Sequence, residues 1–290
     1  MTDLAPVKGK YVTVVPHNRF FHHVVAMCLE HFDTPKRENT VILCDCDFFK
    51  PLEYYKQLYK GKKLIIYQEE QLFSPPKNQE GHTWIPIGTI VAFLKKAQDD
   101  PMCEIWDYDY NNEYWLKGMG VKVDKVQPMK WTKALKTLQN KENPEIDVLF
   151  YGSPNDRRAT IMRDLFRKCG FYANQWSLVN LWGVPLHHID QYIENSKIIL
   201  NLHPAHPYHR QEQTRIFYPV INNKCVLTEA SIRNYFIDQS TGENALVECS
   251  IKYMPYWIKR LLLNEEWKDI ANKSSDIYYR ICNPVLDYQI

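Results

Sequence analysis

Residues 197–229 read KIILNLHPAHPYHRQEQTRIFYPVINNKCVLTE, and this stretch decides the class of the fold. The apolar run over 197–201 predicts a buried strand. A polar loop containing three histidines follows this strand. The periodicity of apolar residues over 211–221 predicts a helix, and residues 224–228 predict a second strand, with Glu229 at its end. A strand, a helix and a further strand in this order are typical of a parallel sheet covered by helices.

The same rhythm continues on both sides of this stretch. Towards the N-terminus, residues 146–151 predict a strand, Gly152 and Ser153 a turn, and residues 156–169 a helix. A helix over 184–196 connects this part to the opening stretch. The first half of the chain repeats the alternation, with strands expected over 11–15, 40–44, 63–67, 103–106 and 121–123, and helices over 20–31, 86–97 and from an Asp109 N-cap to Gly118 or Gly120.

A polar, Lys-rich segment over 128–144 separates the two halves and predicts a linker. We therefore expect an α/β protein of two Rossmann-like domains with parallel sheets, one over 1–140 and one over 141–290, facing each other across a cleft. Ligands of open α/β sheets bind beyond the carboxyl ends of the strands, so this cleft is the expected site. The last helix is expected to pack back on the first domain.

The composition is that of a globular protein of ordinary charge. The 290 residues include 36 Lys+Arg and 34 Asp+Glu, for a net charge of +2, and 13% are aromatic. This balance excludes a strongly cationic binder of nucleic acid or membrane surfaces, although not a local basic patch. The eight cysteines are scattered through apolar runs and include no CxxC pair, which favours free buried thiols. No signal peptide or membrane-spanning run is evident, so we expect a cytoplasmic protein.

The helix that opens around Arg210 has the chemistry of an anion site. The free N–H groups and positive end of a helix suit a diphosphate, and Arg210 and Arg215 add charge-assisted contacts. Glu212 could accept hydrogen bonds from ribose or sugar hydroxyls. The alternative is an ordinary strand, loop and helix, because an acidic residue near a helix N-terminus is stabilising in itself.

The same block carries a family resemblance. Leu-Asn-Leu-His at 200–203, Glu-x-x-Arg-Ile at 212–216 and a strand closing in Glu229 resemble the donor domain of GT-B glycosyltransferases, with the CgeB-like group the nearest. The sequence 146–153 followed by Arg157 and Arg158 resembles the start of such a domain. More weakly, residues 104–112 resemble a late strand of an acceptor domain. The resemblance covers roughly residues 100–250.

This resemblance implies a hexosyl- or pentosyltransferase of glycan biosynthesis. The C-terminal domain would bind a nucleotide sugar, UDP- or GDP-linked, and the N-terminal domain a carbohydrate acceptor, with no cofactor required. Many GT-B enzymes have a ribose-binding Glu where this chain has Tyr218, so that role would fall to Glu212 or Glu229. The residues expected to contact the donor are Gly152, Ser153, Arg158, His203, Arg210, Glu212, Arg215 and Glu229.

An inverting transfer also needs a base for the acceptor hydroxyl, whereas a retaining transfer does not. Side chains that follow predicted strands of the first domain are suited to this task. The expected catalytic residues are His17, Asp45, Glu69 and Asp107.

Three other functions stay open. Asp-x-Asp at 45–47 and again at 107–109 resembles the divalent-metal motif of GT-A glycosyltransferases, although any strand followed by a helix cap supplies this spacing. Phage DNA glucosyltransferases share the two-domain plan, but the chain lacks the cationic surplus that DNA contacts need. A non-catalytic protein that binds a nucleotide or glycan is the third. The three histidines of the loop at 203–209 do not predict a metal site, because Pro204 and Pro207 interrupt any helix there.

Overall fold

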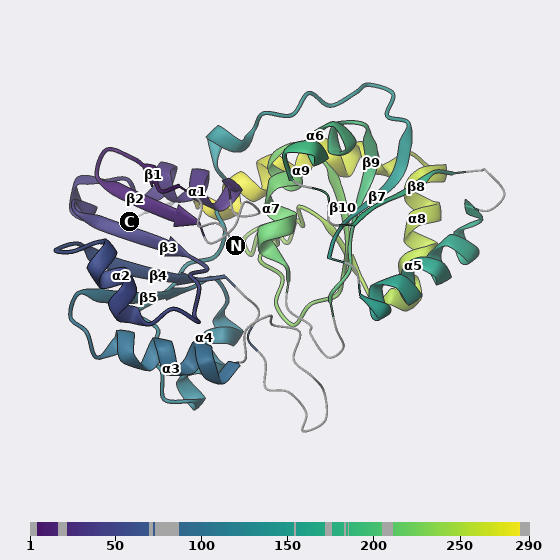
Figure 1. Cartoon of the computed structure of the whole chain (residues 1–290). Coiled ribbons are helices and arrows are strands. Elements are labelled where there is room, and N and C mark those ends of the chain that lie inside the picture. Colours follow the sequence, from purple (N-terminus) through teal and green to yellow (C-terminus); the bar gives the residue numbers. More distant parts are fainter. Residues whose placement is uncertain are drawn as a thin grey trace. The chain divides into compact units, whose positions relative to one another are not determined.

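The computed structural model describes residues 5–16, 22–69, 72, 87–153, 155–171, 176–182, 184, 186–204 and 211–284. The chain divides into two compact units, Met1–Ala134 and Leu135–Ile290, each built around one sheet (Figure 1). Both sheets are dominated by parallel pairs with helices between successive strands. The predicted α/β class with two Rossmann-like sheets is therefore confirmed.

Six strands form the sheet of the first unit, and their spatial order follows the chain. They are β1 (Val7–Lys8), β2 (Val12–Pro16), β3 (Thr40–Cys44), β4 (Lys63–Gln68), β5 (Cys103–Asp107) and β6 (Lys125–Val126). Only β1 pairs antiparallel, with β2; the other pairs are parallel.

The strand predicted over 121–123 is wrong, because pairing begins at β6. Asp124 brings the chain alongside β5: its N–H donates to the Ile105 carbonyl at 2.8 Å, and its carboxylate accepts the Ile105 N–H at 2.9 Å. Lys125 is then the first residue paired, opposite Trp106.

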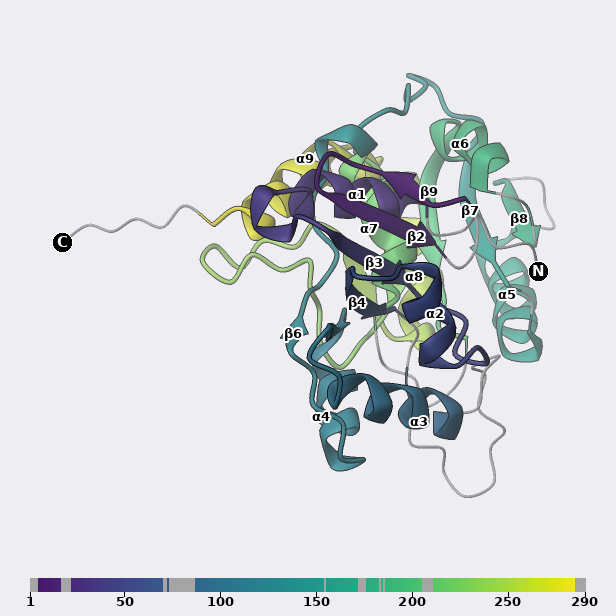
Figure 2. The same ribbon diagram turned by 60° about the vertical axis from the view of Figure 1, so that its left-hand side comes forward.

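Helices cover both faces of this sheet (Figure 2). They are α1 (His22–Phe32), α2 (Leu52–Leu58), α3 (Ile87–Gln98) and α4 (Tyr110–Gly118), together with a short 3-10 helix, η2 (Pro35–Arg37). Alternate strand residues point to opposite faces, so Leu43 packs into the core formed with α2 and α3. Its neighbour Cys44 points the other way, where its sulfur lies 4.0 Å from that of Cys28 on α1.

Five parallel strands form the sheet of the second unit, in the order β11-β10-β9-β7-β8. They are β7 (Ile146–Gly152), β8 (Leu178–Trp182), β9 (Ser196–Asn201), β10 (Cys225–Glu229) and β11 (Val247–Cys249). The strand order runs outward from β7 in one direction to β8, and in the other through β9 and β10 to β11 (Figure 1).

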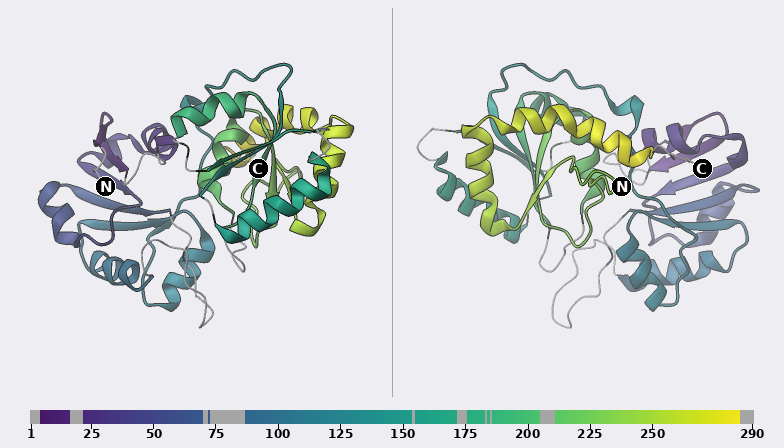
Figure 3. Two further views of the ribbon diagram at one scale, coloured as in Figure 1. Left: turned by 45° about the vertical axis from the view of Figure 1, so that its right-hand side comes forward. Right: turned by 180° about the vertical axis from the view of Figure 1, so that it is seen from behind.

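Helices pack on both faces of this sheet as well (Figure 3). They are α5 (Asp156–Cys169), α6 (Leu186–Glu194), α7 (Gln213–Ile221), α8 (Met254–Leu263) and α9 (Glu266–Cys282), with a 3-10 helix, η5 (Ile251–Tyr253). Phe150 of β7 belongs to the core formed with α5 and α8. The next residue, Tyr151, points to the other face, where its hydroxyl donates to a carbonyl of α7.

The polar segment between the units is divided between them near the 3-10 helix η3 (Lys133–Leu135). Before this point, the N–H groups of Lys133 and Ala134 donate to the carboxylate of Glu30 on α1. After it, the N–H groups of Thr137 and Leu138 donate to the Asn222 side chain at 2.9 and 3.0 Å. Residues 135–140, placed in the first domain by the linker pattern, thus pack on the second unit.

All eight cysteines are free thiols, six of them buried. Within the described ranges, no helix combines the length and apolar character needed to cross a bilayer.

Candidate functional site

The sheet of the second unit has a topological switch point between β7 and β9. From β7 the chain moves outward to β8, and then returns to the opposite side of β7 to form β9. In open α/β sheets, the loops that leave neighbouring strands separate at such a point, and ligands bind there, at the carboxyl ends of the strands. Gly152 ends β7 and Asn201 ends β9, so both lie at the switch point.

Gly152 allows an arginine to lie directly against the backbone at the end of β7. Its φ is 154°, and a Cβ atom built there would lie 3.0 Å from Cζ of Arg215. This contact is tighter than nine in ten real Cβ contacts, and L side chains rarely adopt such a φ, so both features favour glycine. The guanidinium of Arg215 is thereby held over the switch point.

Glu212 joins two arginines into a buried network. Its carboxylate accepts from Nη1 of Arg215 at 2.7 Å and from Nη2 of Arg158 at 2.9 Å. Arg215 Nη1 also lies 3.3 Å from Oδ1 of Asn201, whereas its Nη2 and Nε make no hydrogen bond within the described part of the chain. Arg215 is therefore held through Nη1, whereas the N–H groups of Nη2 and Nε are donors without a partner in the described part of the chain.

Arg158 is the deepest member of this network, with 1% of its side chain exposed. Its remaining N–H groups donate to the carbonyls of Leu202, at 3.0 and 2.8 Å, and of Ser153, at 3.0 Å. Arg158 thus ties the loop after β7 to the loop after β9. The forked geometry of a guanidinium is required for this set of bonds, which a lysine could not make.

The charges of the network stabilise one another. Burial alone would raise the pKa of Glu212, but the positive charges of Arg215 and Arg158 outweigh it and hold that pKa below its usual value. Burial lowers the pKa of Arg158 to about 10, so its guanidinium remains charged at neutral pH. With two arginines to one glutamate, the network carries a net positive charge.

A second ion pair fixes the loop after β9. The two guanidinium nitrogens of Arg157 donate to the carboxylate of Glu229, which ends β10, and Nη1 also donates to the His203 carbonyl at 2.7 Å. The Glu229 carboxylate accepts the His203 N–H at 3.0 Å. The carboxyl ends of β9 and β10 are thereby joined to the first turn of α5.

His203 is buried and uncharged at neutral pH, since burial lowers its pKa. Its Nε2 lies 3.2 Å from the carbonyl oxygen of Ala230, which assigns the ring proton to Nε2. Nδ1 is then an acceptor, and it has no partner within the described ranges.

The position of Arg215 depends on an irregularity in α7. Pro219 lies inside this helix and has no N–H for the Arg215 carbonyl one turn earlier. The hydroxyl of Tyr151 donates to that carbonyl instead, at 3.0 Å. The first turn of α7 is thus anchored to β7 beside Gly152.

The structure brings seven of the eight predicted donor residues together around this switch point. Arg210, the eighth, lies outside the described residues. The seven are Gly152, Ser153, Arg158, His203, Glu212, Arg215 and Glu229. Their contact with a donor stays a prediction.

Sequence reasoning missed two members of the cluster, Arg157 and Asn201. Asn201 is a polar residue that ends an apolar strand, and its Nδ2 donates to Oγ1 of Thr228 at 3.0 Å on the neighbouring strand. Arg157 stands beside Arg158 in the first turn of α5, but the adjacent position gives no sign of its partner on β10. Only Asn201 had a signal that sequence analysis could have used, because it is the polar end of a buried strand.

Three predicted catalytic residues follow neighbouring strands of the first unit. Asp45 follows β3, Glu69 follows β4, and Asp107 ends β5, and all three are buried. Asp107 accepts the N–H of Asp109 at 2.8 Å and the side-chain amide of Asn112 at 3.0 Å. The fourth predicted residue, His17, lies outside the described residues, and the catalytic role of all four stays a prediction.

The two Asp-x-Asp sequences make local hydrogen bonds. Asp109 caps α4, as expected, by accepting the N–H groups of Asn111 and Asn112 at 2.7 and 3.2 Å. Asp47 accepts the N–H of Phe49 at 3.1 Å. Within the described ranges, no three His, Cys, Asp or Glu side chains are grouped in a way that could hold a metal ion.

Comparisons with solved structures identify the architecture. A sucrose-phosphate synthase from Thermosynechococcus elongatus superposes with a TM-score of 0.52 at 10% identity, over 85% of this chain and 70% of the other. A mutant of TarM from S. aureus, in complex with fondaparinux, α-GlcNAc-glycerol and UDP, gives 0.55 at 8% identity, over 82% of this chain and 51% of that one. The chain has the two-domain GT-B fold.

These likenesses extend to the fold and not to the sequence. No protein-family model and no curated protein shows a significant match. The chain spans about half the length of the TarM chains that it matches. The fold implied by the resemblance to GT-B glycosyltransferases is confirmed, whereas the CgeB-like grouping stays a prediction.

Proposed function

We propose that this protein is a glycosyltransferase that moves a sugar from a nucleoside diphosphate to a hydroxyl group of a carbohydrate acceptor. The observation that carries this proposal is the guanidinium of Arg215, held over Gly152 at the switch point of a GT-B sheet. The solved structures of the same fold include a sucrose-phosphate synthase and a TarM complex containing UDP, which supports a nucleotide-sugar donor.

Arg215 is suited to the charge that develops when the sugar leaves. A departing nucleoside diphosphate gains negative charge on its β-phosphate, and a fixed cation at that position lowers the barrier. Arg215 has 18% of its side chain exposed and retains two guanidinium nitrogens without a partner in the described part of the chain. It is therefore the residue that we assign to the diphosphate.

Glu212 and Arg158 act through Arg215 as positioning residues. Both carboxylate oxygens of Glu212 already accept from the two arginines. This arrangement favours a role in orienting the Arg215 guanidinium over direct recognition of a ribose. Arg158 holds Glu212 in turn, from a position that solvent does not reach.

The acceptor is assigned to the first unit, with a base drawn from His17, Asp45, Glu69 and Asp107. This assignment is supported by the placement of the three described side chains at carboxyl ends of β3, β4 and β5. A hexosyl or pentosyl donor and a cytoplasmic location belong to the same proposal, and the eight free thiols agree with a reducing compartment.

The test combines donor binding with turnover. Native protein is screened by thermal shift against UDP- and GDP-sugars, and release of nucleoside diphosphate is then measured with and without oligosaccharide acceptors. A donor stabilises the folded state by mass action. Arg215→Gln should weaken donor binding by about 10- to 100-fold, the value of a charge-assisted hydrogen bond to phosphate.

Arg163→Gln is the matched control, because Arg163 is an exposed arginine of α5 in the same unit. It should leave donor affinity unchanged. Donor binding without release of nucleoside diphosphate would show a binding protein instead of an enzyme. Equal donor affinity of native protein and Arg215→Gln would overturn the site assignment.

A further inference from the structure

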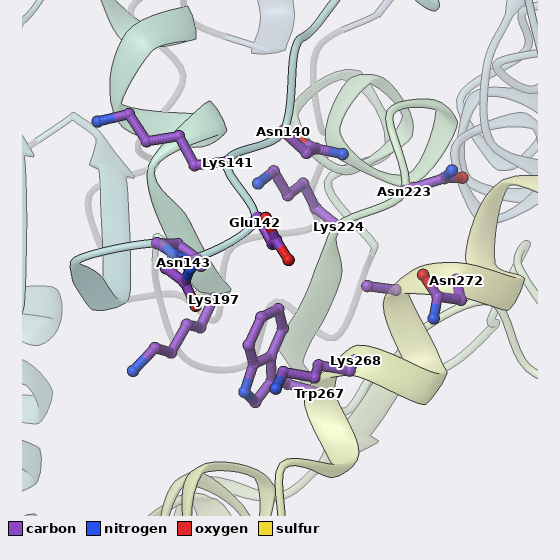
Figure 4. Close-up of a pocket in the computed structure, with 12 residues that line it drawn as sticks. Asn140, Lys141, Glu142, Asn143, Lys197, Asn223, Lys224, Trp267, Lys268 and Asn272 are labelled. Atoms are coloured by element: carbon purple, nitrogen blue, oxygen red, sulfur yellow. The ribbon is translucent and has the colours of Figure 1, made fainter.

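A cavity lies at the amino-terminal edge of the second unit's sheet, away from the switch point. Its volume is about 430 Å³, within the range of small-molecule sites. Figure 4 shows its walls: Trp267 and Lys268 come from α9, Lys197 from the beginning of β9, and Lys224 from the residue before β10. The segment before β7 completes it, with Asn140, Lys141, Glu142, Asn143 and Pro144.

This cavity is separate from the candidate donor site. Lys197 is the second residue of β9, whereas Asn201 ends that strand at the switch point. The full length of the six-residue strand is roughly 17 Å, at 3.3 Å per residue. A ligand of monosaccharide size therefore cannot touch both sites.

Among the side chains that line the cavity, basic residues outnumber acidic ones. Four lysines line the cavity, Lys141, Lys197, Lys224 and Lys268, against one acidic residue, Glu142. Lys197 pairs with Asp147 at 2.5 Å, and Lys268 pairs with Glu265 at 2.8 Å. Lys224 is buried, and its ammonium donates to the backbone carbonyls of Glu194 and Ser196. The nearby charge of Glu194 favours the protonated amine, but no ion pair joins the two side chains. An anion is the complement of this lining.

Trp267 adds a flat apolar surface to the cationic lining. The indole packs in part against the core of the second unit and is thereby held in place. Four asparagines also line the cavity: Asn140, Asn143, Asn223 and Asn272. A side-chain amide both donates and accepts hydrogen bonds, as neighbouring sugar hydroxyls require, and an indole face suits the C–H face of a pyranose.

The geometry points to a second ligand site in this cavity, for a phosphorylated sugar whose ring lies on Trp267 and whose phosphate is held by the lysines. The inference is independent of the proposed glycosyltransfer, because it uses none of the residues at the switch point. It gives the protein a means of holding an anionic saccharide while the donor site is occupied.

Lys224 provides a reporter for the bound anion. Burial lowers the pKa of Lys224 to about 8, although the charge of Glu194 opposes this shift. Lys141, Glu142, Lys197 and Lys268 share the cavity with it. A phosphate favours the protonated amine, so binding should weaken as the pH rises through about 8 and the amine loses its proton.

The experiment is calorimetric titration of the full chain with glucose 6-phosphate, with glucose, inorganic phosphate and AMP as comparison ligands. Lys268→Glu should weaken binding of glucose 6-phosphate by about tenfold or more. Lys273→Glu is the matched control, because Lys273 is an exposed lysine of α9 that does not line the cavity. It should bind as the native protein does, and saturating UDP should not compete.

Three results would overturn the inference. The first is no binding of glucose 6-phosphate, or equal binding by native protein and Lys268→Glu. The second is inorganic phosphate binding as tightly as the ester, because the indole would then contribute nothing. The third is tighter binding of AMP, because the ring on Trp267 would then be a base instead of a sugar.

Discussion

Gly152 is the residue on which the geometry of the candidate donor site depends most directly. A side chain at this position would displace the guanidinium of Arg215, because its first carbon would lie only 3.0 Å from Cζ. The backbone φ of 154° is also one that other residues rarely adopt. Glycine at this position therefore lets the guanidinium of Arg215 lie close to the backbone at the end of β7.

Replacing Gly152 with alanine should affect both stability and donor binding. Backbone strain and displacement of Arg215 should lower the free energy of unfolding by about 1–3 kcal/mol. Affinity for UDP should fall by about tenfold or more, because the guanidinium moves off the diphosphate position. Urea denaturation measures the first effect and calorimetry the second.

Gly88→Ala is the control at the same scale. Gly88 lies in α3, where an added Cβ meets nothing within 4 Å. Alanine should there be neutral or stabilising by up to about 1 kcal/mol, since it is the better helix former. The role given to Gly152 would fail if Gly152→Ala bound UDP as tightly as the native protein.

The residues of the site were only partly predictable for a physical reason. Glu212 and Arg215 lie one helical turn apart, so their contact follows from local spacing. The pair of Arg157 with Glu229 joins positions 72 residues apart. Such a contact depends on which strands are neighbours, and neither residue's local sequence contains that information.

At the scale of the element, α7 is anchored by a hydrogen bond that replaces one of its own. Pro219 leaves the Arg215 carbonyl without its helical donor, and Tyr151 supplies a hydroxyl. An unsatisfied buried carbonyl costs free energy. The tyrosine on β7 therefore stabilises the helix that carries Glu212 at its N-cap position and Arg215 in its first turn.

Tyr151→Phe tests this anchor, because it removes the hydroxyl and keeps the ring. The free energy of unfolding should fall by about 1–2 kcal/mol, and UDP affinity should fall with it as the first turn of α7 loosens. Tyr253→Phe serves for comparison: Tyr253 lies in η5 of the same unit with 55% of its surface exposed. Similar stabilities of the two variants would contradict the anchor.

Elements with both an apolar run and clear ends were predictable. The helix expected over 156–169 is found with the same limits, capped by Asn155 and ended by Gly170 in the left-handed conformation. The short helix α2 was missed because it buries only Leu52 and Tyr55, too few to show a period. The strand β8 was also missed, because Asn180 interrupts its apolar run.

At the scale of the whole molecule, the order of the strands within each sheet could not be predicted from the sequence. Alternation of strands and helices predicted two parallel sheets, and both are present. It could not predict the order of the strands. The described strands of the first unit follow chain order, whereas in the second unit the chain adds β8 on one side of β7 and β9 on the other. This change of side creates the switch point, because only there do neighbouring strands send their loops apart.

This difference between the sheets leads to a prediction about where a nucleotide acts. Saturating UDP should slow amide hydrogen exchange in the second unit, at 152–153, 201–203 and the start of α7, since a bound diphosphate stabilises the conformation that holds it. Exchange in β3, β4 and β5 should change little, because their residues do not contact the donor in the proposed mechanism. Hydrogen-exchange mass spectrometry resolves these segments. Protection confined to the first unit would place the nucleotide there and contradict the assignment of Arg215.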